Sequence, residues 1–157
     1  MSRPLRIGVI GSEHCGSEVA ELAHRVGALI AAAGAVLVCG GRGGVMRAAA
    51  QGAERAGGLT VGILPGEDPA DANAEILIPI PTGLGDARNA VIVRTAEAVI
   101  AIAGRWGTLS EAAFCLKNGV PLVRLRSDLP ALPIPEAATP EEAVDWALEQ
   151  ARSRRAR

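Results

Sequence analysis

The chain has 157 residues, of which 49% are hydrophobic and only 2% aromatic, and its formal net charge is −1. A chain of this length can bury a core of its own without disulfide or metal staples, and that core must consist of Ala, Val, Leu and Ile. The balanced charge excludes broad electrostatic capture of nucleic acid, and no apolar run reaches the roughly 18 residues that a membrane span needs.

Strand and helix patterns alternate in the first part of the chain. Residues 6–10 form a β-branched run that ends at Gly11, which is typical of a buried strand. Residues 19–33 then place apolar side chains at helical spacing, and Gly34 ends the pattern. We expect a strand at residues 36–39, a helix at residues 45–56 and a strand at residues 60–64.

The same alternation continues after a polar loop. We expect a strand or extended edge at residues 75–80, a helix at 87–96, a strand at 98–102, a helix at 108–117 and a strand at 120–125. A proline-rich connection at residues 127–138 leads to a last helix, which begins with Thr139 as N-cap and Glu142 as its capping-box partner. The arginines within residues 152–157 are typical of a flexible basic tail.

Strands that alternate with helices and are almost wholly apolar predict a parallel sheet covered on both faces. We therefore predict an α/β fold, a modified Rossmann, doubly wound, mostly parallel sheet of six to seven strands, forming one domain over residues 1–157. Ligands of such sheets bind beyond the carboxyl ends of the strands. Four loops can reach that crevice: residues 11–16, residues 40–44, the stretch before Arg88, and residues 103–108.

The glycine-rich loop at residues 40–44 contains four glycines and Arg42 between a strand and a helix. Glycines let backbone N–H groups approach an anion, the helix adds its positive end, and an arginine can fork onto phosphate oxygens. A tight turn that needs glycine for positive φ is the alternative. Four glycines favour the anion site.

The loop at residues 104–108 repeats this arrangement, and Thr108 with Glu111 forms a T-x-x-E pattern. The pattern also describes a capping box, which would need no ligand. Glu111 is therefore either a helix cap or a functional carboxylate.

Several other chemistries are excluded by what these loops lack. Residues 11–17 have the glycine spacing of a Walker A loop but no lysine, and neither glycine loop fits the NAD fingerprint. The only lysine, Lys117, lies late on a predicted helix, which argues against pyridoxal phosphate. His14 could serve as an acid or base but is more typical of an ordinary loop residue. The histidines and cysteines have no zinc-ligand spacing, so we expect neither a metal nor a cofactor.

The three cysteines, Cys15, Cys39 and Cys115, are scattered and form no C-x-x-C pair. That usage suits buried thiols in a reducing compartment. The first residues run directly into a strand pattern without the apolar stretch of a signal peptide. We expect a cytoplasmic protein.

These loops resemble the LOG family, whose relatives include molybdenum cofactor carrier proteins, from the first strand to about Leu125. The family's G-G-G-x-x-G-L-M-G motif corresponds to residues 40–47, its P-G-G-x-G-T-x-x-E motif to residues 103–111 and its M-H-x-R-K motif to residues 85–89. The chain resembles the short branch with Gly-Gly-Arg-Gly-Gly-Val-Met more than the cytokinin-activating enzymes.

The resemblance implies a modified Rossmann fold, usually dimeric, that hydrolyses a nucleoside 5′-monophosphate to the free base and ribose 5-phosphate. It implies that Arg88 and Glu111 are the catalytic pair. The loops and the resemblance together predict a nucleotide-binding set: Gly11, Ser12, Gly40, Gly41, Arg42, Gly43, Gly44, Met46, Asn89, Gly104, Arg105, Trp106, Gly107 and Thr108.

Four residues depart from the family motifs: Ala103 replaces a proline, Arg105 a glycine, Asp86 a histidine and Asn89 a lysine. Arg105 adds bulk and charge where the family's backbone approaches the ligand. The main prediction is the hydrolase, and the alternative is a non-catalytic carrier for a phosphorylated ligand such as a nucleotide or the molybdenum cofactor. In either case we expect a homodimer that buries flat, alanine-rich helix faces such as residues 45–56, with no nucleic-acid or membrane partner.

Overall fold

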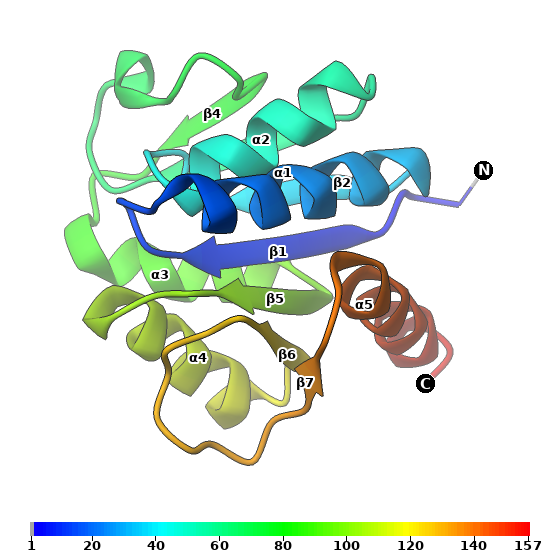
Figure 1. Ribbon diagram of the computed structural model, residues 1–157. Coiled ribbons are helices and arrows are strands. Elements are labelled where there is room, and N and C mark those ends of the chain that lie inside the picture. Colours follow the sequence, from blue (N-terminus) through cyan, green and yellow to red (C-terminus); the bar gives the residue numbers. More distant parts are fainter. Residues whose placement is uncertain (1) are drawn as a thin grey trace.

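The computed structural model describes residues 2–157 and shows a seven-stranded sheet in the order β4-β3-β2-β1-β5-β6-β7 (Figure 1). Each neighbouring pair of strands is parallel. The strands are β1 (Arg6–Gly11), β2 (Val36–Cys39), β3 (Thr60–Leu64), β4 (Ile78–Pro81), β5 (Ala98–Ile102), β6 (Leu122–Leu125) and β7 (Glu136–Ala137). The predicted doubly wound α/β fold is confirmed.

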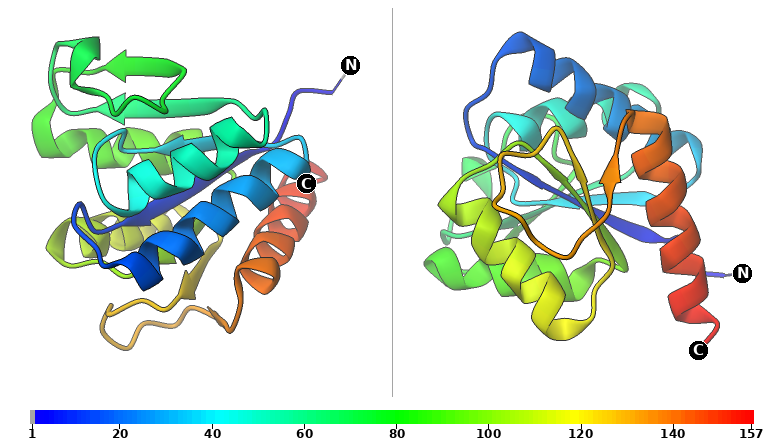
Figure 2. Two further views of the ribbon diagram at one scale, coloured as in Figure 1. Left: turned by 45° about the horizontal axis from the view of Figure 1, so that its top comes forward. Right: turned by 60° about the horizontal axis from the view of Figure 1, so that its bottom comes forward.

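Helices cover both faces of this sheet, as the two views of Figure 2 show. One face carries α1 (Ser17–Ala32), α2 (Val45–Arg55) and α5 (Pro140–Arg155), and the other carries α3 (Arg88–Thr95) and α4 (Trp106–Asn118). Two short 3-10 turns are η1 (Pro69–Asp71) and η2 (Gly85–Ala87). Side chains alternate along a strand, so β1 contributes to the hydrophobic cores on both faces of the sheet. Ile7 and Val9 pack in the core with α1 and α2, and Ile10 packs in the core with α3 and α4. No helix within residues 2–157 is long and apolar enough to cross a membrane.

The alanine-rich face of α2 is buried inside the molecule, against α1. A Cβ on Gly27 would lie 1.9 Å from the carbonyl oxygen of Ala49, and one on Gly52 would lie 1.9 Å from that of His24. The two glycines therefore let the helix backbones touch, which buries Ala49 and Ala53 completely or nearly so. The expectation that this face forms a dimer interface is wrong, because α1 already occupies it.

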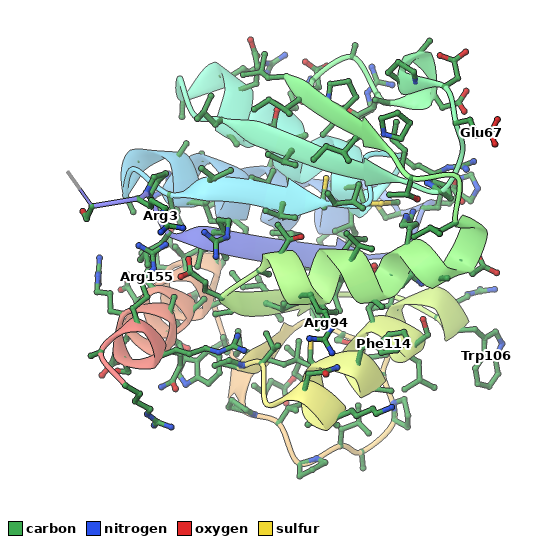
Figure 3. The ribbon with its side chains drawn as sticks, turned by 180° about the vertical axis from the view of Figure 1, so that it is seen from behind. Arg3, Glu67, Arg94, Trp106, Phe114 and Arg155 are labelled. Atoms are coloured by element: carbon green, nitrogen blue, oxygen red, sulfur yellow. The ribbon has the colours of Figure 1, made fainter. Side chains whose placement is uncertain are left out.

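The end of the chain is ordered rather than a flexible tail. Helix α5 continues to Arg155, whose Nη2 lies 2.7 Å from the Glu97 carboxylate and 2.7 Å from the carbonyl oxygen of Pro4. Figure 3 shows Arg155 beside Arg3, close to the start of the chain. The predicted tail is wrong over residues 152–155, because the largely buried Glu97 carboxylate needs a counter-charge and Arg155 supplies it.

The edge strand β4 begins later than predicted. The Thr60 hydroxyl donates to the carbonyl oxygen of Glu75 and accepts from the N–H of Leu77, at 2.7 and 2.8 Å. These side-chain bonds replace ladder bonds, so regular pairing starts only at Ile78. The N-cap of α5 follows the prediction, since Thr139 Oγ1 accepts from the N–H of Glu142 at 3.2 Å.

Candidate anion-binding crevice

The crevice lies at the carboxyl ends of the strands, where the sheet order reverses between β1 and β5. Its cavity is about 570 Å³. The lining residues come from the end of β1, from the loops after β1, β2, β3 and β5, from the turn η2 and from the starts of α2, α3 and α4: Gly11, Ser12, Glu13, His14, Arg42, Met46, Pro65, Asp86, Arg88, Asn89, Arg105, Gly107, Thr108 and Glu111. The topology therefore brings together four loops that lie far apart in the sequence.

Most glycines of the 40–44 loop are required by packing within the protein. A Cβ on Gly40 would lie 2.8 Å from the Arg88 guanidinium, and one on Gly41 would lie 2.7 Å from Leu64. Gly44 has a φ of 59°, and a Cβ there would lie 2.3 Å from the carbonyl oxygen of Ser12. The same oxygen accepts a hydrogen bond from the N–H of Val45 at 3.0 Å, so this N–H at the start of α2 is not available to a ligand. An anion in this crevice would therefore have to be held by other groups, namely Arg42 of this loop and the start of α4.

The start of α4 lies two residues earlier than predicted. Arg105 is at the N-cap position without a side-chain cap bond, and Thr108 lies inside the first turn, almost fully buried. Thr108 and Glu111 therefore do not form a capping box, and that interpretation of Glu111 is wrong. The first N–H groups of a helix have no partner within the helix, so this turn presents donors and a partial positive charge.

The loop before α4 takes a path that the LOG motif's proline could not follow. Ala103 has a φ of 51°, whereas a proline ring holds φ near −65°. Gly104 follows with a φ of 116°, and a Cβ there would lie 2.5 Å from the Thr108 side chain. The replacement of the motif's proline by Ala103 thus fits the backbone observed here.

Arg88 is the central cation of the crevice and is half-buried at the start of α3. Its guanidinium donates to the side-chain oxygen of Asn89 and, at 3.4 Å, to the carbonyl oxygen of Gly40. The Nε–H is buried and has no hydrogen-bond partner within residues 2–157. Asn89 also donates to the Ser110 hydroxyl at 3.0 Å, which ties α3 to α4. Arg88 is therefore held in place by its terminal nitrogens, while its Nε–H is left open within residues 2–157.

Glu111 is 7% exposed and lines the floor of the same crevice. Burial raises the pKa of Glu111 to about 8, and the charge of Arg88 offsets this only in part. At neutral pH its side chain is mainly the uncharged acid. A neutral carboxyl group donates a hydrogen bond and does not repel an anion bound beside it.

The other charges favour an anionic ligand. Arg42 forms an ion pair with Glu13 at 2.9 Å, on the exposed rim. Arg105 is exposed, and no carboxylate of residues 2–157 lies within 4.0 Å of it. Burial disfavours the charged form of Glu111, so the crevice has three arginines and only two other acidic side chains, Glu13 and Asp86. In that same range, no group of three or more His, Cys, Asp or Glu side chains has a metal-binding arrangement.

Ten of the predicted ligand-binding and catalytic residues line the crevice and six do not. Those outside the lining are Gly40, Gly41, Gly43, Gly44, Gly104 and Trp106. Sequence reasoning did not select Glu13, His14, Pro65 and Asp86 as site residues, although they line the crevice. The position of Glu13, His14 and Pro65 after predicted strands, and of Asp86 two residues before Arg88, was the available signal.

A parallel sheet with a cationic crevice at its switch point defines a Rossmann-like protein suited to a small anionic ligand. Comparison with known proteins gives the family. The SLOG cluster4 family matches residues 4–152, and the chain belongs to this family.

Relatives cover nearly the whole chain. An uncharacterized protein from Archaeoglobus fulgidus is 43% identical over 144 residues, which is 92% of this chain and 95% of the relative. The molybdenum cofactor binding protein from the phototrophic bacterium Rippkaea orientalis superposes with a TM-score of 0.88 at 37% identity, covering 95% of this chain and 98% of that one. The molybdenum cofactor carrier protein from Chlamydomonas reinhardtii superposes with a TM-score of 0.86 at 34% identity, covering 96% and 99%.

Proposed function

We propose that this protein is a non-catalytic binding or carrier protein for a phosphorylated small molecule, and that its cargo is the molybdenum cofactor. The similarity to the Rippkaea and Chlamydomonas proteins, at 37% and 34% identity over at least 95% of the chain, supports this cargo. The crevice favours an anion of this kind, and the carrier replaces the hydrolase as the leading function.

The observation that carries the proposal is a set of cationic donors left open in the crevice: within residues 2–157 the buried Nε–H of Arg88 has no hydrogen-bond partner, and Arg105 at the start of α4 has no ion pair. Cleavage of an N-glycosidic bond uses an ionised carboxylate to stabilise positive charge on the sugar or to activate water. A side chain whose pKa is about 8 is mostly protonated at pH 7 and supplies little of that charge. The burial that raises the pKa of Glu111 favours an uncharged carboxyl group, which donates a hydrogen bond to an anionic ligand and does not repel it.

The crevice can hold a phosphate from several sides. Arg105 is unpaired within residues 2–157 and stands at the first turn of α4, where the helix dipole favours negative charge. The unpartnered Nε–H of Arg88 and the protonated Glu111 carboxyl add donors from the floor. Hydrogen bonds to an ionised phosphate are roughly twice as strong as neutral ones, so these groups give both affinity and orientation.

The test is retention of the cofactor itself. The protein is incubated anaerobically with molybdenum cofactor released from a molybdoenzyme and then desalted, and bound molybdenum and pterin are measured by mass spectrometry and fluorescence. We expect molybdenum and pterin in equal amounts on the wild type and little of either on Arg105→Ala. Arg94→Ala is the matched control, because Arg94 lies at the far end of α3 and bonds to Asn118 outside the crevice (Figure 3). Wild type that retains no cofactor would overturn the proposal.

A nucleoside 5′-monophosphate phosphoribohydrolase is the second candidate, favoured by the presence of Arg88 and Glu111 in one crevice. Incubation with a panel of nucleoside 5′-monophosphates, followed by detection of free base, tests it. Release of base by the wild type and none by Glu111→Gln would establish the hydrolase. The absence of free base with every nucleotide would leave the carrier.

A further inference from the structure

A second hollow adjoins the crevice and has no role in the function proposed so far. Its volume is about 490 Å³, and Arg105 lines both spaces. Its walls are Trp106, Leu109, Leu129 and Pro130, and Asp128 stands among them. A ligand whose phosphate meets Arg105 in the crevice can therefore extend into this apolar hollow.

Trp106 is the unusual residue among those that line the second hollow. The residue is 84% exposed, and its side chain projects from the start of α4 (Figure 3). The chain contains only two tryptophans and one phenylalanine and has no tyrosine. Placing one of its few large rings in water beside an anion site has no packing benefit, whereas a flat ligand ring can stack on it.

The part of the hollow formed by residues 128–130 is anchored by Arg124 of β6. Its guanidinium donates to the carbonyl oxygens of Leu129, Pro130 and Leu132 at 3.2, 3.3 and 3.3 Å. Ser127 fixes the preceding turn, because its hydroxyl donates to the carbonyl oxygen of Ala103 at 3.3 Å and accepts the N–H of Leu129 at 3.2 Å. A surface loop with five such bonds is preorganised.

Asp128 lies between these anchored residues and is exposed. No arginine, lysine or histidine of residues 2–157 lies within ion-pair distance of its carboxylate. A carboxylate accepts two hydrogen bonds side by side, so it matches a ring edge that offers two neighbouring N–H donors. The 2-amino-4-oxopyrimidine ring of pterins and guanine has this edge, and adenine does not.

We propose that this hollow is a subsite for a 2-amino-4-oxopyrimidine ring, which stacks on Trp106 and donates to Asp128 while its phosphate lies in the crevice. The inference rests on the proposed function, because the phosphate must occupy the crevice for the ring to reach the hollow. It names the ring class of the ligand, and it makes Trp106 and Asp128 specificity-determining residues.

The test compares four ligands by equilibrium dialysis: ribose 5-phosphate, AMP, GMP and neopterin 3′-monophosphate. We expect GMP and the pterin to bind about tenfold more tightly than ribose 5-phosphate, which is the order of a stacked base. In a Trp146→Phe background, Trp106 is the one remaining tryptophan, so GMP should quench its fluorescence and ribose 5-phosphate should not.

Two variants separate stacking from edge recognition. Trp106→Ala should remove the tenfold advantage of GMP over ribose 5-phosphate, and Asp128→Asn should remove the preference for GMP over AMP. Leu116→Ala is the matched control, because Leu116 is an exposed apolar residue on the same helix that lines neither space. Both variants should keep the affinity of the wild type for ribose 5-phosphate.

Other outcomes overturn the subsite. Ribose 5-phosphate that binds as tightly as GMP means that the ring adds nothing, while the proposed function stands. If Trp106→Ala changes the molecular mass measured by light scattering and leaves the affinities for the four ligands unchanged, Trp106 is a contact between copies of the protein and not part of a subsite. Failure of all four ligands also overturns the subsite, and the cofactor-retention experiment decides the proposed function independently.

Discussion

Glu111→Gln should change the pH dependence of stability in a direction set by the burial of the carboxyl group. The folded protein raises the pKa of Glu111 from an ordinary 4.5 to about 8. Between these values the folded state keeps a proton that the unfolded chain releases, so the free energy of unfolding falls as pH rises. In this range each pH unit lowers the free energy of unfolding by about 1.4 kcal/mol. The loss amounts to about 3 kcal/mol between pH 4.5 and pH 7, and it levels off above pH 8.

Glutamine has nearly the same shape and does not titrate in this range. The variant and the wild type should therefore be similarly stable near pH 5, and the variant should be more stable at pH 8 by roughly 3–5 kcal/mol. For a domain of this size that difference corresponds to roughly 6–20 °C in Tm. Urea unfolding at pH 5, 6, 7, 8 and 9 measures it. Parallel curves for the two proteins would mean that Glu111 is ionised in the fold, and the argument for a neutral crevice acid would fail.

Four further results are expected. Gly44→Ala should lower Tm more than Gly57→Ala. Both glycines have positive φ (59° and 77°), but a Cβ at Gly44 would lie 2.3 Å from a backbone oxygen, whereas one at Gly57 would meet nothing within 4 Å. Equal Tm values for the two variants in thermal melts would contradict this. Glu97→Gln should cost about 1–3 kcal/mol at pH 7, where its carboxylate accepts from Arg155 and from the Arg6 N–H. These bonds lower the pKa of Glu97 below its ordinary value. The carboxylate therefore contributes its stabilisation at pH values above the ordinary pKa and loses it as the pH falls through the lowered pKa. Urea unfolding of the wild type and the variant at pH 7 and pH 3 measures the contribution and its loss. Arg88→Ala should lose cofactor retention with a small change in Tm, and unchanged retention would remove Arg88 from the site. The family resemblance still implies a homodimer, formed through a surface other than the α2 face that α1 covers, so light scattering at micromolar concentration should give a dimer; a monomer mass near 16.0 kDa would refute it.

The fold class and most of the crevice could be predicted from the sequence. Buried strands are uniformly apolar and helices repeat their apolar residues at a period of 3.6, so local patterns set the order of the elements. Parallel strands then align their carboxyl ends at one edge, which is why Arg42, Arg88 and Arg105 were expected together before the structure placed them in one cavity. The structure also requires glycines in the 40–44 loop, but they make room for Arg88, Leu64 and the backbone of Ser12 and not for an anion.

The roles of single residues depended on neighbours that are distant in the sequence. Burial by the fold raises the pKa of Glu111, and Arg155 is ordered because Glu97, 58 residues away, needs its charge. Gly40 is required because Arg88 passes over it, and Trp106 borders a separate hollow because Arg124 holds the loop opposite. Periodicity is a local property of the chain and determined the elements by itself, whereas burial, protonation and close approach are properties of the packed molecule, and only the tertiary structure decided them.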